Sequence, residues 1–171
     1  MRRAARPESL LAWLRRAALA YDDWWQANVA VPEISSPGAR WTPDCQEISV
    51  TLAAAAIGHD VVAHCGSVCM REDRDRERGY HWWLTVEGRR FDPKGYVLAQ
   101  RYALPRAYSR YAGELEDSDD PDCAFEAEAL ARPFTSLEEA AGYSAEGLPV
   151  EYILEKCGPP PVRQRLSRRR S

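Results

Sequence analysis

The chain has 171 residues, of which 45% are hydrophobic and 29% charged, and its formal net charge at neutral pH is −3. These values are ordinary for a globular protein and do not argue for a disordered or membrane protein. A chain of this length can bury enough apolar surface to fold as one domain, so we expect a single core.

The sequence contains no recognisable membrane-spanning or secretory segment. No stretch approaches the roughly 18 consecutive apolar residues that a membrane-spanning helix needs. The most apolar N-terminal run, Leu10 to Leu14, is interrupted by Arg15 and Arg16 and is followed by no signal-peptide cleavage pattern. We therefore expect no membrane association and a cytoplasmic location. The five cysteines, an odd number, are then better explained as thiols than as a disulfide framework.

An amphipathic helix is predicted over residues 8–27. Apolar side chains recur there at three- and four-residue steps, while Arg15, Arg16 and Asp22 fall on other faces. A loop rich in proline, serine and glycine follows at residues 32–38. The apolar stripe consists of Leu10, Leu14, Ala17, Ala18, Tyr21 and Trp25.

A second helix is predicted from Pro43 to about Ile57. Thr42 suits the N-cap and Pro43 the first helical position, and Gly58 closes the alanine-rich run that follows. This assignment places Cys45 in the first turn of the helix.

A strand and a hairpin come next. Residues 61–68 predict a buried strand interrupted at Gly66, and Glu87-Gly88 is typical of a tight turn between two short strands. A two-residue turn makes Val86 face Arg89, and therefore Trp83 face Asp92.

This register sorts the hairpin side chains into two faces. His81 shares the face of Trp83, so His81 and Asp92 become diagonal neighbours about 7 Å apart at the backbone. The opposite face is predicted to be the core face. It carries Tyr80, Trp82, Leu84, Val86 and Phe91.

The rest of the chain gives weaker signals. Residues 96–111 favour short helices or irregular structure, and the stretch from Glu114 to Glu128, with eight acidic residues and no basic ones, is predicted to be an exposed loop. Ser136 or Thr135 can cap a short helix that runs through Ala141, and residues 149–157 predict another that ends at Gly158. We expect one domain over residues 1–157 and a basic, disordered tail over 158–171.

The residues that suggest chemistry are Cys45, His81 and Asp92. A thiol attacks a carbonyl as the thiolate, which a helix N-terminus and a neighbouring imidazolium both stabilise. Cys45 has the helix N-terminus from its place in the first turn and could obtain the imidazolium from His81. Asp92 would then accept a hydrogen bond from the other ring nitrogen of His81 and fix its tautomer. Asp44 opposes the thiolate, so we expect its carboxylate to point away from the sulfur.

This order of residues resembles the transglutaminase-like branch of the papain-like cysteine protease superfamily. The motifs that carry the resemblance are a cysteine at a helix start, a glycine that ends the helix, a His-aromatic-Trp run and an Asp-Pro pair. They cover residues 42–98, and the chain departs from the family at Lys94, where threonine is common. In this sequence they are Cys45, Gly58, His81-Trp82-Trp83 and Asp92-Pro93.

The resemblance implies an α+β fold in which the nucleophile helix packs on a small antiparallel sheet, with additional helices around it. It also implies acyl transfer through a thioester on Cys45, as in a peptidase, an amidase or deamidase, or an amide-forming transferase, with a peptide or protein as the substrate. The alternative is a catalytically inactive binding module of the same fold that holds a protein or peptide partner. In that module either the distance from the Cys45 sulfur to His81 would be too long for a hydrogen bond even through water, or the chain itself would fill the cleft.

Several further residues were weighed for a role. Trp83 is predicted at the rim of the site, where it could line a substrate cleft, and Gln26, Asn28 and Trp41 are candidates for the oxyanion-binding side chain. Cys65, Cys69 and His64 lack the spacing of a paired metal cluster, so no metal is expected, and the resemblance implies no cofactor. The arginine-rich end carries no interleaved aromatic residues, so no nucleic-acid binding is expected. The alternative for Cys45 itself is a buried, apolar residue without a chemical role, since free cysteines are often buried.

Overall fold

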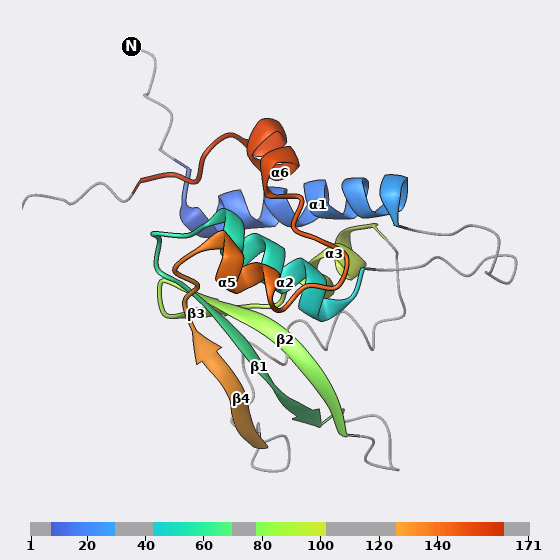
Figure 1. Cartoon of the computed structure of the whole chain (residues 1–171), viewed down its shortest axis with the longest axis vertical. Helices are drawn as coiled ribbons and strands as arrows, with labels where there is room; N and C mark the ends of the chain where they lie inside the picture. The colour runs from blue at the N-terminus through green and yellow to red at the C-terminus, as the bar shows by residue number, and fades with distance from the viewer. Residues whose placement is uncertain (1–7, 30–42, 70–77, 102–125, 163–171) are drawn as a thin grey trace, which may run out of the picture.

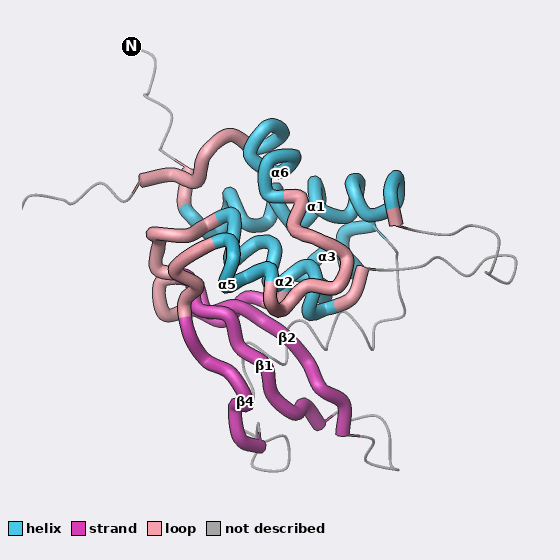
Figure 2. Tube along the Cα trace, viewed as in Figure 1, coloured by secondary structure: helices cyan, strands magenta, loops and turns pink. Residues whose placement is uncertain are grey.

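The fold is a mixed α+β arrangement of five described helices and a four-stranded antiparallel sheet. The computed structural model describes residues 8–29, 43–69, 78–101 and 126–162 (Figure 1). Figure 2 shows the helices gathered at one end of the sheet, with β1, β2 and β4 extending beyond them. In chain order the elements are α1 (Leu10–Asn28), α2 (Cys45–Ala55), β1 (Val61–Cys69), β2 (Arg78–Val86), β3 (Arg89–Phe91), α3 (Pro93–Arg101), β4 (Glu126–Arg132), α5 (Leu137–Ala141) and α6 (Val150–Cys157).

Helix α1 confirms the predicted amphipathic helix at the N-terminus. Ser9 caps it, because its side-chain oxygen accepts a hydrogen bond from the backbone N–H of Ala12 at 3.2 Å. All six predicted stripe residues are buried. At the other end of the described chain, the Trp13 indole donates to the Gly158 carbonyl at 3.0 Å, so the first residue of the predicted tail contacts α1. Residues 163–171 of that tail lie outside the described residues.

Helix α2 is the central helix of the molecule. It packs against α1 and α6 on one side and against β1 and β2 on another, and all nine residues from Glu47 to Ala55 are buried. The alanines at 53–55 fit this position because small side chains allow neighbouring elements to approach closely. The predicted N-cap was wrong: Asp44, not Thr42, caps the helix, so the first helical residue is Cys45 and not Pro43.

The sheet has the strand order β3-β2-β1-β4. The β2–β3 register confirms the predicted hairpin, with Leu84 opposite Phe91 and Val86 opposite Arg89. Both turn residues have positive φ, 50° for Glu87 and 78° for Gly88, as a tight two-residue hairpin turn requires.

Strand β4 was not predicted from the sequence. Residues 126–128 were assigned to an exposed acidic loop, but residues 126–132 pair with β1, for example Leu130 with Cys65. Alanine, glutamate and arginine have low intrinsic preference for strands, so this strand depends on its pairing with β1. The register between β1 and β4 shifts between Cys65 and Ser67, at the predicted interruption around Gly66.

Helices α5 and α6 agree with the expectations in type and position. Helix α5 is capped by Ser136, whose hydroxyl accepts from the Glu139 N–H at 3.1 Å, and α6 ends before Gly158, which has φ 72°. Helix α3 is one continuous helix, whereas short helices or irregular structure were expected after residue 96. Within the described ranges, no helix combines the length and apolarity needed to cross a bilayer.

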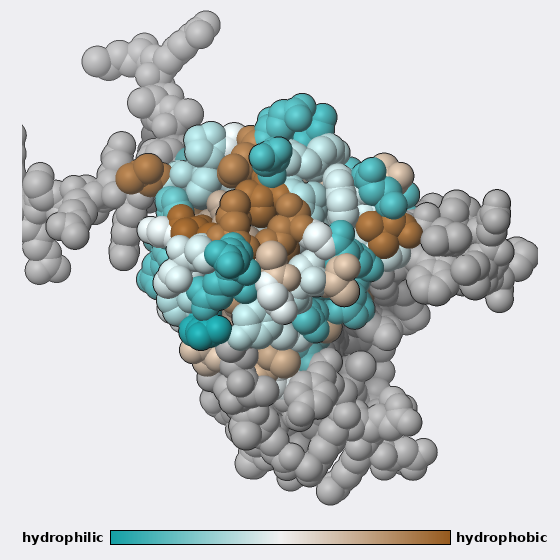
Figure 3. All heavy atoms as spheres, in the orientation of Figure 1, coloured by the Kyte–Doolittle hydropathy of each residue, from teal (hydrophilic) through white to brown (hydrophobic). Residues whose placement is uncertain are grey.

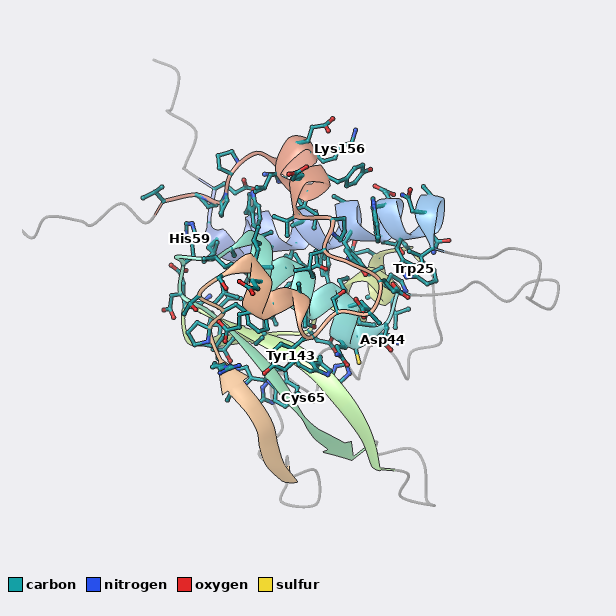
Figure 4. All side chains as sticks on the ribbon, in the orientation of Figure 1. Trp25, Asp44, His59, Cys65, Tyr143 and Lys156 are labelled. Carbon is teal, nitrogen blue, oxygen red and sulfur yellow. The ribbon has the colours of Figure 1, made fainter. Side chains whose placement is uncertain are left out.

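On the face shown in Figure 3, hydrophobic residues gather between α5 and α6. Leu148 and Leu154 are partly buried apolar residues of this region that pack against the core. In the same orientation Asp44, the neighbour of Cys45, lies at the end of α2 away from this patch (Figure 4).

Candidate active site

The first turn of α2 positions Cys45. The Asp44 carboxylate accepts a hydrogen bond from the Gln46 backbone N–H at 2.8 Å, which fixes the start of the helix at Cys45. The Cys45 N–H therefore belongs to the first turn, whose N–H groups have no intrahelical acceptor and carry partial positive charge. The Cys45 side chain is half-buried, so part of the residue is open to solvent.

Asp92 joins the hairpin to α3 and makes two hydrogen bonds with its two carboxylate oxygens. Oδ1 accepts from the Gly95 backbone N–H at 3.0 Å, so Asp92 caps α3, and Pro93 takes the first helical position. Oδ2 lies 2.9 Å from Nε2 of His81. The cap thus holds the carboxylate toward the imidazole.

His81 and Asp92 form a buried pair. Their relative exposures are 6% and 5%, so little water competes for the hydrogen bond between them. Burial opposes the charged imidazolium, but the hydrogen bonds to Asp92 and to Cys45, together with their negative charges, outweigh it and raise the pKa of His81 to about 9. His81 is therefore protonated at neutral pH.

Cys45 lies close to His81, near enough to raise the pKa of the imidazole. Because Asp92 occupies Nε2, the ring nitrogen that remains for the Cys45 sulfur is Nδ1. Ser49, one helical turn after Cys45, donates to the Trp82 carbonyl at 3.2 Å and holds α2 on β2 beside His81. The structure thus brings together all three residues that the sequence singled out.

Trp83 does not lie at the rim of the site as predicted. Its exposure is 2%, which leaves almost no surface for a substrate to contact. Side chains alternate between the faces of a strand, so Trp83 shares the face of His81, and its indole stacks beside that ring. The prediction was wrong because it assumed that one face of the strand is buried and the other is exposed to solvent.

The structure supports none of the proposed oxyanion side chains directly. Gln26 is exposed near the C-terminal end of α1. The Asn28 amide donates to the Trp24 carbonyl at 2.7 Å and is engaged with its own helix. Trp41 lies outside the described residues.

Two residues beside Cys45 were missed in the sequence. The Gln46 side-chain amide donates to the Tyr143 carbonyl at 2.6 Å, and the buried Glu47 carboxylate accepts from the Ala145 N–H at 2.7 Å and from the Ser144 hydroxyl at 2.5 Å. These bonds fasten the segment after α5 to the turn that holds Cys45. Figure 4 shows Tyr143, Asp44 and Cys65 on the same side of the molecule. Because these partners are almost a hundred residues apart, local sequence patterns could not reveal them.

The other described thiols have a different environment from Cys45. Burial raises the pKa of Cys65 and, with the charge of Cys45, disfavours its thiolate. Burial is also the largest influence on Cys157, and it raises the pKa of that thiol. Among the described residues, no group of three or more His, Cys, Asp or Glu side chains is arranged to hold a metal ion.

Comparison of the chain with protein-family models, with curated proteins and with solved structures found no match. The functional argument therefore depends on the geometry around Cys45.

Proposed function

We propose that this protein is a cysteine-dependent acyl-transfer enzyme with a transglutaminase-like, papain-like fold, and that it acts on an amide of a peptide or protein through a thioester on Cys45. The observation that carries the proposal is the buried His81–Asp92 pair, together with a half-buried Cys45 that lies near enough to His81 to raise the pKa of the imidazole. The fold assignment is supported by the packing of the Cys45 helix on an antiparallel sheet whose hairpin supplies His81.

Each of the three residues has a defined role in this proposal. The imidazolium of His81 stabilises the Cys45 thiolate, and the N-terminus of α2 adds partial positive charge beside the sulfur. Asp92 accepts a hydrogen bond from the Nε2–H group and so keeps Nδ1 directed at the sulfur. The Asp44 carboxylate opposes the thiolate, but its hydrogen bond to the Gln46 N–H commits one oxygen to the helix cap.

In the first half of the reaction, the Cys45 sulfur attacks the carbonyl carbon of the amide, and the π electrons move onto the oxygen. The Cys45 backbone N–H is placed to donate to this oxyanion, as first-turn N–H groups do in other acyl-transfer sites. When the tetrahedral intermediate collapses, the C–N bond breaks, His81 gives its Nδ1 proton to the departing amine, and a thioester remains.

In the second half, His81 is neutral and acts as the base. It removes a proton from water or from a second amine, which attacks the thioester carbonyl. The C–S bond then breaks, and the thiolate and imidazolium form again. Water gives hydrolysis, whereas an amine gives a new amide.

The non-catalytic alternative is less well supported. It predicted either a separation between the Cys45 sulfur and His81 too long for a hydrogen bond even through water, or a cleft filled by the chain itself, whereas Cys45 lies near enough to His81 to raise the pKa of the imidazole. A buried imidazolium beside a partly exposed thiol also has no evident use in holding a partner.

The experiment that tests the proposal is competitive labelling with iodoacetamide at pH 7, followed by mass spectrometry of the labelled cysteines. Cys45 is expected to react at least tenfold faster than Cys157, which is also half-buried. His81→Gln should reduce the labelling rate of Cys45, because the imidazolium is lost, and leave that of Cys157 unchanged.

Activity is then sought by screening peptide amides for ammonia or amine release, with Cys45→Ala as the inactive control and Cys157→Ala as the matched cysteine control. Equal reactivity of Cys45 and Cys157 would count decisively against a thiol active site. Amine release that persists in Cys45→Ala would likewise exclude Cys45 as the nucleophile.

A further inference from the structure

We propose that Trp83 and His64 are positioning residues for His81: the Trp83 indole, held between the two histidine rings, keeps the His81 imidazole in the plane that joins Cys45 to Asp92. This inference rests on the proposed function and assigns a role to two residues that the mechanism does not otherwise use.

The three rings form a stack across β1 and β2. The Trp83 and His81 centroids are 6.4 Å apart with an interplanar angle of 15°, and the Trp83 and His64 centroids are 5.4 Å apart at 7°. Offset stacking of aromatic rings is favourable over centroid distances of about 4.5–7 Å. The strand register explains the arrangement, because His64 is paired directly with Trp83 and His81 lies two residues away on the same face.

Hydrogen bonds and stacking restrain His81 in different directions. The bond to Asp92 acts in the plane of the imidazole and leaves the ring free to tilt out of that plane. A flat indole against the ring face opposes this tilt. Trp83, itself 2% exposed, also keeps water from that face of the His81–Asp92 pair.

His64 is in turn fixed from its far side. Its Nε2 atom lies 2.8 Å from the Thr85 hydroxyl, so the ring cannot rotate without breaking this hydrogen bond. His64 therefore supports Trp83 although it has no place in the acyl-transfer steps. Its partly buried position is consistent with support of a buried ring and not with contact to a substrate.

The test compares Trp83→Leu, which removes the flat face, with Trp83→Phe, which keeps an aromatic face. Two quantities are measured on the full chain: the rate constant for labelling of Cys45 by iodoacetamide between pH 5 and 9, and the solvent-exchange rate of the His81 Nε2 proton by NMR. Trp83→Leu is expected to lower the labelling rate roughly three- to tenfold, the contribution of an aromatic pair, and to speed proton exchange. Trp83→Phe should restore both values to near those of the wild type.

Two further variants make the result specific. Trp13→Leu removes an equally buried tryptophan from α1 and should leave both quantities unchanged, whereas His64→Leu should shift both in the direction of Trp83→Leu. An unchanged labelling rate and proton exchange in Trp83→Leu would overturn the inference, as would equal losses in Trp13→Leu. A wild-type Cys45 that reacts no faster than Cys157 would instead refute the proposed enzyme, and the NMR exchange rates would still decide the role of Trp83.

Discussion

The raised pKa of His81 predicts that the stability of the protein depends on pH in a defined window. The folded pKa of about 9 lies above the unfolded value near 6.5, so the folded state holds the extra proton between these limits. The stabilisation is fully present below about pH 6.5 and is lost as pH rises through 9. The interval corresponds to about 3 kcal/mol of unfolding free energy, because one pKa unit is worth about 1.4 kcal/mol. His81 is only 6% exposed, so solvent screens this contribution little.

The assay is urea unfolding at a series of pH values from 6 to 10, with wild type compared against His81→Gln. The glutamine amide can donate to Asp92 but does not titrate in this range, so subtraction of the two profiles cancels the other ionisable groups. The difference should shrink by about 3 kcal/mol between pH 6.5 and 10 with little change in the urea m-value. A difference that stays constant within about 1 kcal/mol would refute the assignment of a protonated His81.

Three other substitutions test the surroundings of the site. The two carboxylate oxygens of Asp92 accept separately from His81 and from the Gly95 N–H, and Asp92→Asn replaces them with one carbonyl oxygen. An NMR titration should therefore find the pKa of His81 lowered toward 6.5. Arg101→Ala removes the guanidinium that donates to the buried Asp22 at 2.9 Å, and urea unfolding should give a loss of about 1–3 kcal/mol; no loss would mean that other groups satisfy this carboxylate. Ser136→Ala removes the α5 cap and should cost about 1 kcal/mol by the same assay, whereas Ser136→Asp, which retains a capping oxygen, should cost little.

The agreement between sequence and structure is closest where neighbouring residues decide the outcome. The turn at Glu87-Gly88 sets the hairpin register, and alternation along β2 then places His81 on the side of Asp92. The Asp-Pro pair carried a further local signal, since aspartate suits an N-cap and proline the first helical position. That signal predicts the start of α3, although the helix was not expected from it.

The errors came from contacts between distant segments. Thr42 and Asp44 are both suitable N-caps, and the choice between them is made by the folded backbone, in which the Asp44 carboxylate reaches the Gln46 N–H. Strand β4 has a poor strand composition and exists through its pairing with β1. Trp83 was expected to be open to solvent, but the sequence could not decide this. The alternation of side chains along a strand assigns each residue to one of two faces and does not tell whether other elements cover that face.

By itself the sequence determined a helix with Cys45 in its first turn and the shared face of His81 and Asp92, because both follow from spacing over a few residues, whereas the α+β class followed from the family resemblance. Only the tertiary structure decided that α2 lies against β2 with Cys45 close to His81. It also decided that Gln46 and Glu47 hold the segment after α5, and that Trp83 is buried and stacks with the rings of His64 and His81. Those arrangements depend on how separate elements pack, and packing follows from the burial of whole faces and not from any local run of residues.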